Sequence, residues 1–116
     1  MARPVLMVVD DEQNVLNTCR DIFKDGYLVV PKQSAAEALS FLADNHVDLI
    51  FLDITMPEMD GIEMLNQVRM FDDPPPVVMV TATRTLKSAV TAMKLGAFDY
   101  ITKPFDIDEL RLIAEK

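Results

Sequence analysis

Five short apolar runs alternate along the chain with segments in which apolar residues recur every three or four positions. The runs cover residues 5–9, 27–30, 49–52, 77–80 and 98–101. A short continuous apolar run predicts a buried strand, whereas recurrence at three and four positions predicts one buried face of a helix. A strand followed by a helix, repeated five times, predicts an α/β fold with a parallel sheet.

The helical spacing is clearest in the segment after the first run. Its apolar residues all fall on one face of a helix: Val15, Leu16, Cys19, Ile22 and Phe23. Ser34, followed by Glu37 three residues later, has the pattern of a capping box and predicts the start of the second helix. Three shorter segments with similar spacing predict the remaining helices, over residues 62–68, 86–93 and 107–114.

The order of the strands follows from how their runs are interrupted. The first, third and fourth runs are uninterrupted, as expected for central strands covered by helices on both faces. Pro31 directly follows the second run and Asp99 interrupts the fifth, and both features favour the edges of a sheet. With right-handed crossovers, this predicts a flavodoxin-like, doubly wound, five-stranded parallel sheet in the order 2-1-3-4-5, with residues 1–116 forming a single domain.

Composition restricts the function more than it restricts the fold. The 116 residues carry a net charge of −8, which argues against direct contact with nucleic acid, because phosphate binding needs a basic face. No apolar run approaches the roughly 20 residues that span a bilayer, so no contact with a membrane is expected. The single cysteine, Cys19, cannot form an internal disulfide, and we expect a cytoplasmic protein.

Polar side chains that could do chemistry follow four of the five predicted strands. Asp10 and Asp11 follow the first strand, Asp53 the third and Thr81 the fourth, and Lys103 comes two residues after the fifth run. In an open parallel sheet, ligands bind beyond the carboxyl ends of the strands, at the point where the strand order reverses. We therefore expect these five side chains to meet at the C-terminal ends of the strands, centred between the first and third strands.

Three aspartates that meet at one point need a cation. At about 4 Å, each pair of carboxylates repels by about 4 kcal/mol at an effective dielectric constant of 20. Mg²⁺ suits such a site because it prefers oxygen ligands and keeps water molecules that a phosphate can replace. A carboxylate beside Mg²⁺, an ammonium and a hydroxyl has the groups needed to form an acyl phosphate. A simpler alternative is that the acids after the first strand only cap the following helix, which is worth about 0.3–1 kcal/mol.

The residues at this edge match a known family in type and in spacing. The match covers essentially the whole chain, and together these residues resemble the receiver domain of bacterial two-component response regulators. The motifs that carry the resemblance are Asp10-Asp11, Asp53-Ile-Thr-Met56-Pro57-Glu-Met59-Asp60-Gly61, Thr81-Ala82 and Tyr100-Ile-Thr-Lys103-Pro104-Phe105.

The resemblance assigns a role to each carboxylate. It implies that Asp53 is the phosphoacceptor and that the cofactor is Mg²⁺. Asp11 would bind the metal directly, and Asp10 would hold it mostly through water. Asp53 itself and the backbone carbonyl of Thr55 would complete the protein ligands.

The resemblance also assigns the residues that bind and sense the phosphoryl group. Thr81 and Lys103 would bind phosphoryl oxygens, with a cis peptide bond between Lys103 and Pro104 directing the lysine inward. Thr81 and Tyr100 would form the switch, because the ring can enter the space that the threonine leaves when it turns toward the phosphoryl group. An edge-strand tyrosine whose hydroxyl meets solvent is the ordinary alternative for Tyr100.

Partners are implied at the same level. The phosphoryl group would come from a sensor histidine kinase or a phosphotransfer protein. The face formed by the fourth helix, the fifth strand and the fifth helix would control an output domain or partner, and it is also the candidate surface for a homodimer. Residues 92–106 resemble receivers of transcription-activating regulators, so we expect the chain to be the N-terminal part of a longer regulator.

Three other functions compete with this interpretation. Phosphohydrolases of the haloacid-dehalogenase kind also use an aspartate nucleophile and Mg²⁺, but they place a second aspartate two residues after it, where this chain has Thr55. A flavin- or nucleotide-binding module would need a glycine-rich loop, and the chain has only three scattered glycines. A degenerate receiver that acts only as a docking surface is disfavoured because every residue needed for phosphorylation is present.

Overall fold

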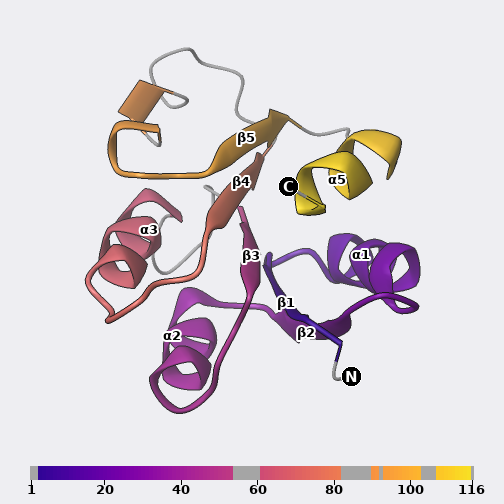
Figure 1. Ribbon diagram of the computed structural model, residues 1–116, viewed down its shortest axis with the longest axis horizontal. Coiled ribbons are helices and arrows are strands. Elements are labelled where there is room, and N and C mark those ends of the chain that lie inside the picture. Colours follow the sequence, from indigo (N-terminus) through magenta and orange to yellow (C-terminus); the bar gives the residue numbers. More distant parts are fainter. Residues whose placement is uncertain (1–2, 54–60, 82–89, 92, 103–106, 116) are drawn as a thin grey trace.

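Five parallel strands form one sheet in the order β2-β1-β3-β4-β5 (Figure 1). In this computed structural model the strands are β1 (Val5–Val9), β2 (Leu28–Lys32), β3 (Leu49–Leu52), β4 (Val77–Thr81) and β5 (Asp99–Thr102). The structure describes residues 3–53, 61–81, 90–91, 93–102 and 107–115. The predicted fold class and strand order are confirmed.

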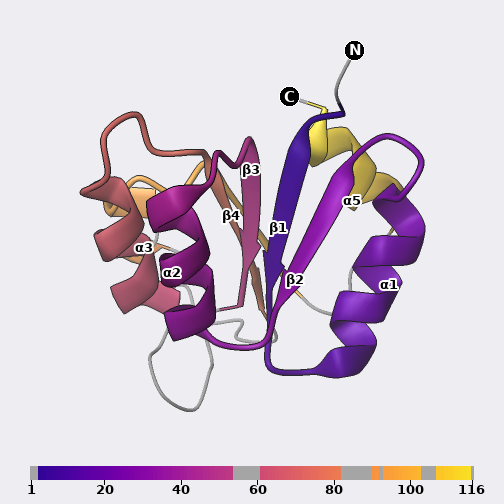
Figure 2. The same ribbon diagram turned by 90° about the horizontal axis from the view of Figure 1, so that it is seen from below.

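Helices cover both faces of the sheet (Figures 1 and 2). Helices α1 (Gln13–Phe23) and α5 (Ile107–Ala114) lie on one face, and α2 (Ala35–Asp44) and α3 (Gly61–Arg69) lie on the other. Residues 90–91 and 93–94 are also helical, and the rest of the helix predicted over residues 86–93 falls outside the described residues. No helix in the described ranges has both the length and the apolar character needed to cross a bilayer.

The central strands bury alternate side chains in two separate cores, which explains why their apolar runs have no polar interruption. In β1, Leu6 and Val8 join the core under α1 and α5, whereas Met7 and Val9 join the core under α2 and α3. Successive side chains of a strand point to opposite faces, so both faces need apolar residues when helices cover both. Polar residues are therefore displaced to the ends of the strands.

The edge strands differ slightly from their predicted bounds. β2 begins one residue later than predicted and continues through Pro31, which pairs in register with Val8 of β1. Proline is tolerated there because an edge strand has a neighbour on one side only, so a missing N–H need not break the ladder. Tyr27, predicted to start this strand, instead packs edge-on against Phe23 at 5.4 Å, and its hydroxyl donates to the Ala114 carbonyl at 3.3 Å.

Predicted details of two helices are also found. The Ser34 hydroxyl accepts a hydrogen bond from the Glu37 N–H at 3.2 Å, as expected at the start of α2. In α1, the buried side chains are Leu16, Cys19 and Phe23, all on the predicted face.

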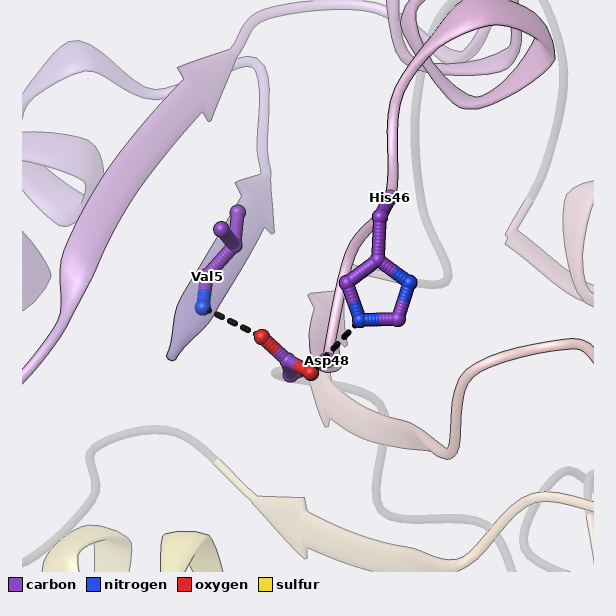
Figure 3. Close-up of polar contacts among 3 residues, drawn as sticks. All are labelled: Val5, His46 and Asp48. Carbon is purple, nitrogen blue, oxygen red and sulfur yellow. Dashed lines mark hydrogen bonds and ion pairs between the residues drawn. The ribbon is translucent and has the colours of Figure 1, made fainter. Parts of the chain in front are cut away.

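At the N-terminal end of the sheet, Asp48 joins the starts of β1 and β3 (Figure 3). One carboxylate oxygen accepts a hydrogen bond from the Val5 N–H at 2.7 Å, and the other lies 2.7 Å from Nε2 of His46. The hydrogen bond from Val5, and then that from His46, lower the pKa of Asp48 below its ordinary value. The lone histidine of the chain is thus part of a structural contact at this end of the sheet.

Two leucines of α5 provide a matched test of how the sheet holds this helix. Leu110 is fully buried in the core under α1 and α5, whereas Leu112 is 61% exposed. We expect Leu110→Ala to lower the free energy of unfolding by about 2–5 kcal/mol, because it leaves a cavity in the core. Leu112→Ala should change it by no more than about 0.5 kcal/mol. Urea unfolding monitored by circular dichroism measures both values, and equal losses would contradict the described packing of α5.

Candidate functional site

Asp10 and Asp53 are buried side by side at the C-terminal ends of the two strands where the sheet order reverses. Among the described residues, these two are the polar or charged ones that are buried, with exposed fractions of 2% for Asp10 and 5% for Asp53. Val9 of β1 pairs in register with Leu52 of β3, and the Asp53 N–H donates to the Val9 carbonyl at 3.0 Å. The pairing of β1 with β3 therefore brings together two aspartates that are 43 positions apart in the sequence.

A turn after β1 fixes the Asp10 carboxylate. Its Oδ1 atom accepts a hydrogen bond from the Glu12 N–H at 2.9 Å, and the Asp10 N–H donates to the Lys32 carbonyl at 3.1 Å. Aspartate commonly stabilises a turn by binding a backbone N–H two residues on. Glu12 occupies the N-cap position of α1, but its side chain makes no capping hydrogen bond. Helix capping by the Glu12 side chain therefore does not account for this group of acids.

Three consecutive carboxylates gather at this point. One oxygen atom each from Asp10, Asp11 and Glu12 lies within 4.8 Å of the others, and the last two side chains are exposed. This donor set fits a hard divalent cation such as Mg²⁺, which takes carboxylate and water oxygens. Glu12 is the residue that sequence reasoning left out of the predicted metal site. Its position directly after Asp11 in the sequence could have indicated that its carboxylate lies near the other two.

The packing beneath the two buried aspartates is tight. A cavity of about 10 Å³ lies there, and its lining includes Asp10, Asp53 and the side chains of Val15 and Cys19. That volume holds one water molecule at most. A ligand as large as a phosphoryl group must therefore approach Asp53 from the solvent side of the site.

The remaining predicted site residues are only partly within the described chain. Thr55, Lys103 and Pro104 lie outside the described residues, as does the side chain of Thr81. The backbone of Thr81 ends β4 in register with Thr102 of β5, at the same end of the sheet as Asp53. Their roles, including the cis peptide bond before Pro104, stay predictions.

Tyr100 can be placed directly. It lies in β5 opposite Met79 of β4, is partly buried, and packs against the core under α2 and α3. Burial raises the pKa of its hydroxyl above the ordinary value for tyrosine. The ring therefore packs partly against the core and is partly exposed.

Comparison with known proteins identifies the family. The family model described as the response regulator receiver domain matches residues 6–115 of the chain. The chain belongs to the response regulator receiver domain family.

Receiver relatives include parts of longer transcription regulators. Regulatory protein AtoC of Escherichia coli is 41% identical over 112 residues, which are 96% of this chain and 24% of AtoC. The DNA-binding transcriptional regulator NtrC of Escherichia coli is 38% identical over 117 residues, covering 100% of this chain and 25% of NtrC. The chain thus spans about a quarter of the length of these relatives.

Solved receiver structures share the fold over nearly the whole chain. The CheY-like response regulator receiver domain protein of Methanospirillum hungatei has a TM-score of 0.91 at 29% identity, covering 98% of this chain and 93% of that protein. A response regulator receiver domain protein of Clostridium thermocellum has a TM-score of 0.89 at 29% identity, covering 97% and 91%.

Family membership decides between the broad functional classes left open by the sequence. Receiver domains are phosphorylation-dependent signalling switches of two-component systems rather than metabolic enzymes. Membership therefore favours the receiver interpretation over a phosphohydrolase or a nucleotide-binding module.

The carboxylate site predicts how Mg²⁺ changes the stability of this receiver. A cation that binds only the folded chain raises the free energy of unfolding, by about 1.4 kcal/mol at ten times its Kd. We expect Asp10→Asn and Asp11→Asn each to remove most of this gain, because each variant removes one carboxylate charge. Asp21→Asn, on the exposed side of α1, serves as the control and should keep it.

The measurement is urea unfolding in a chelating buffer and in saturating Mg²⁺. An equal gain in wild type and in the two site variants would show that Mg²⁺ binds elsewhere or not at all.

Proposed function

We propose that this receiver accepts a phosphoryl group on Asp53 in a Mg²⁺-dependent reaction and thereby switches between two states. The observation that carries the proposal is the burial of Asp53 beside Asp10, at the reversal of the strand order. Burying two carboxylates together is costly, and a divalent cation bound between them would offset that cost.

The chemical step needs one nucleophile and a neutralised phosphoryl group. A carboxylate oxygen of Asp53 attacks phosphorus, a P–O bond forms, and the bond from phosphorus to the donor breaks, with the electron pair leaving on the donor. Asp10, Asp11, Asp53 and the Thr55 carbonyl would hold Mg²⁺, which supplies positive charge to the phosphoryl oxygens. The hydrogen bond from the Glu12 N–H keeps the Asp10 carboxylate in position for this role.

Two further side chains would bind the transferred group. Lys103 would neutralise one phosphoryl oxygen, and the Thr81 hydroxyl would donate a hydrogen bond to another. Support comes from the position of β4 and β5, because their C-terminal ends lie at the same end of the parallel sheet as Asp53. The tight packing beneath Asp53 supports approach of the donor from solvent, where a protein partner can present it.

The donor would be a histidine of a sensor kinase or of a phosphotransfer protein, and the receiver would act in the cytoplasm. The output would be a transcription module, since AtoC and NtrC are regulators about four times longer than the region they share with this chain. The face formed by residues 90–94, β5 and α5 would pass the signal on and could pair two copies. Four large apolar side chains are exposed in or next to these segments: Val90, Met93, Phe98 and Leu112.

Phosphorylation can be tested directly on the intact chain. With Mg²⁺ and acetyl phosphate, we expect wild type to gain one phosphoryl group by intact-mass spectrometry, and Asp53→Asn to gain none. Asp21→Asn removes an aspartate far from the site and should behave like wild type. Phosphorylation of the Asp53→Asn variant, or of wild type without Mg²⁺, would overturn the proposal.

We also propose that Tyr100 moves when the site is phosphorylated. A switch from about 1% to about 99% active requires that phosphorylation favour the active state by about 5.5 kcal/mol. Part of this difference would come from Thr81, whose turn toward the phosphoryl group opens space for the ring.

The Tyr100→Ala variant separates phosphorylation from this response. We expect it to bind beryllofluoride, a phosphoryl analogue, as wild type does, because Tyr100 lies outside the carboxylate group. The amide chemical-shift changes that beryllofluoride causes in residues 90–100 should fall by at least about half. Unchanged shifts in that segment would show that the ring plays no part in the switch.

A further inference from the structure

A second hollow lies at the opposite end of the sheet from Asp53. It is a cleft of about 190 Å³ between the connection from α2 to β3 and the connection from α3 to β4. Figure 2 shows both connections at the upper end of the strands, whereas β1 ends at the lower side. β3 alone separates the two ends by about 13 Å, at 3.3 Å per residue.

Half of the residues that line this cleft are apolar, and its volume is close to that of one large side chain. Leu42 and Val47 are buried and Phe71 and Pro75 are half-buried, and all four line it. Sites for small organic ligands usually have about 300–1,000 Å³. The cleft therefore suits a single side chain presented by another protein better than a free ligand.

Two carboxylates stand on one wall of the cleft. Asp72 and Asp73 are exposed, and within the described residues neither side chain makes a hydrogen bond or an ion pair. Asp73 holds a φ of 50°, in the left-handed region, and three prolines follow it at residues 74–76. Because proline fixes its own φ, this wall is set before any partner binds, which lowers the entropy lost on binding.

No side chain of the opposite wall forms an ion pair with Asp72 or Asp73 in the described part of the chain. His46 lines the cleft, but its Nε2 atom is bound to Asp48 at 2.7 Å, and Asp48 also binds the start of β1 (Figure 3). The chain as a whole carries a net charge of −8, which favours a basic partner at this acidic wall.

We infer that this cleft, defined by residues 42–47 and 71–75, anchors an arginine side chain of a protein partner. The aliphatic part of arginine covers the apolar floor, and its planar guanidinium donates hydrogen bonds to Asp72 and Asp73. Met70, whose side chain is 79% exposed directly before Phe71, offers apolar surface for a neighbouring residue of the partner. The cleft lies at the far end of the sheet, so a partner can occupy it while Asp53 is phosphorylated.

NMR spectra of the amide groups of the intact chain can test this inference. The probe is N-acetyl-arginyl-leucinamide, with the matched citrulline peptide as a neutral control of the same shape. Saturating Mg²⁺ is present so that the carboxylates near Asp10 are occupied. The variant Asp72→Asn/Asp73→Asn removes both charges, and asparagine tolerates the left-handed backbone at position 73. Asp21→Asn/Asp25→Asn removes the same charge from exposed positions elsewhere and serves as the control.

We expect the arginine peptide to shift the amide signals of residues 42–47 and 71–75. Its affinity should fall at least about fivefold in Asp72→Asn/Asp73→Asn, and remain unchanged in the control variant. The citrulline peptide should bind wild type at least about fivefold more weakly. Absence of binding, equal binding of the two peptides, equal losses in both variants, or shifts centred on Asp10 would each overturn the inference. Beryllofluoride binding at Asp53 is independent of all these outcomes.

Discussion

The parallel pairing of β1 with β3 is the constraint on which the site depends. It places Val9 beside Leu52, so that the residues that follow, Asp10 and Asp53, become neighbours. The hydrogen bond from the Asp53 N–H to the Val9 carbonyl, at 3.0 Å, extends the ladder to the aspartate itself. A shift of this register by one residue would separate the carboxylates and turn each side chain of β3 to the other core.

The helices on both faces of the sheet explain why the fold was easy to predict from the sequence. β1, β3 and β4 lie between two layers of helices, so every position needs an apolar residue and the runs are continuous. Pro31 marked the edge correctly but not the end of its strand, because an edge strand tolerates a missing N–H on its open side. With the edge strands known, the right-handed crossover connections then left few possible strand orders.

The site was less fully predictable, because part of it depends on backbone contacts that have no sequence pattern of their own. Asp10, Asp11 and Asp53 stood out because polar residues follow buried strands. The approach of Glu12 depends on the turn in which the Asp10 carboxylate binds the Glu12 N–H. The cleft beside Asp72 was also not predicted, since its two walls come from connections about 27 positions apart that meet only in the folded chain.

The two ends of the sheet thus have different properties. The C-terminal end gathers carboxylates that fit a divalent cation, whereas the N-terminal end is held by Asp48 and has a cleft lined by both apolar residues and aspartates. Phosphorylation of Asp53 in the presence of Mg²⁺ is what we propose for the C-terminal end. A crystal structure of the chain with Mg²⁺ and beryllofluoride tests it most directly. We expect beryllofluoride joined to a carboxylate oxygen of Asp53, with Mg²⁺ bound beside it by Asp11 and held by Asp10. A fluoride complex at any other residue, or a metal bound away from these aspartates, would contradict it.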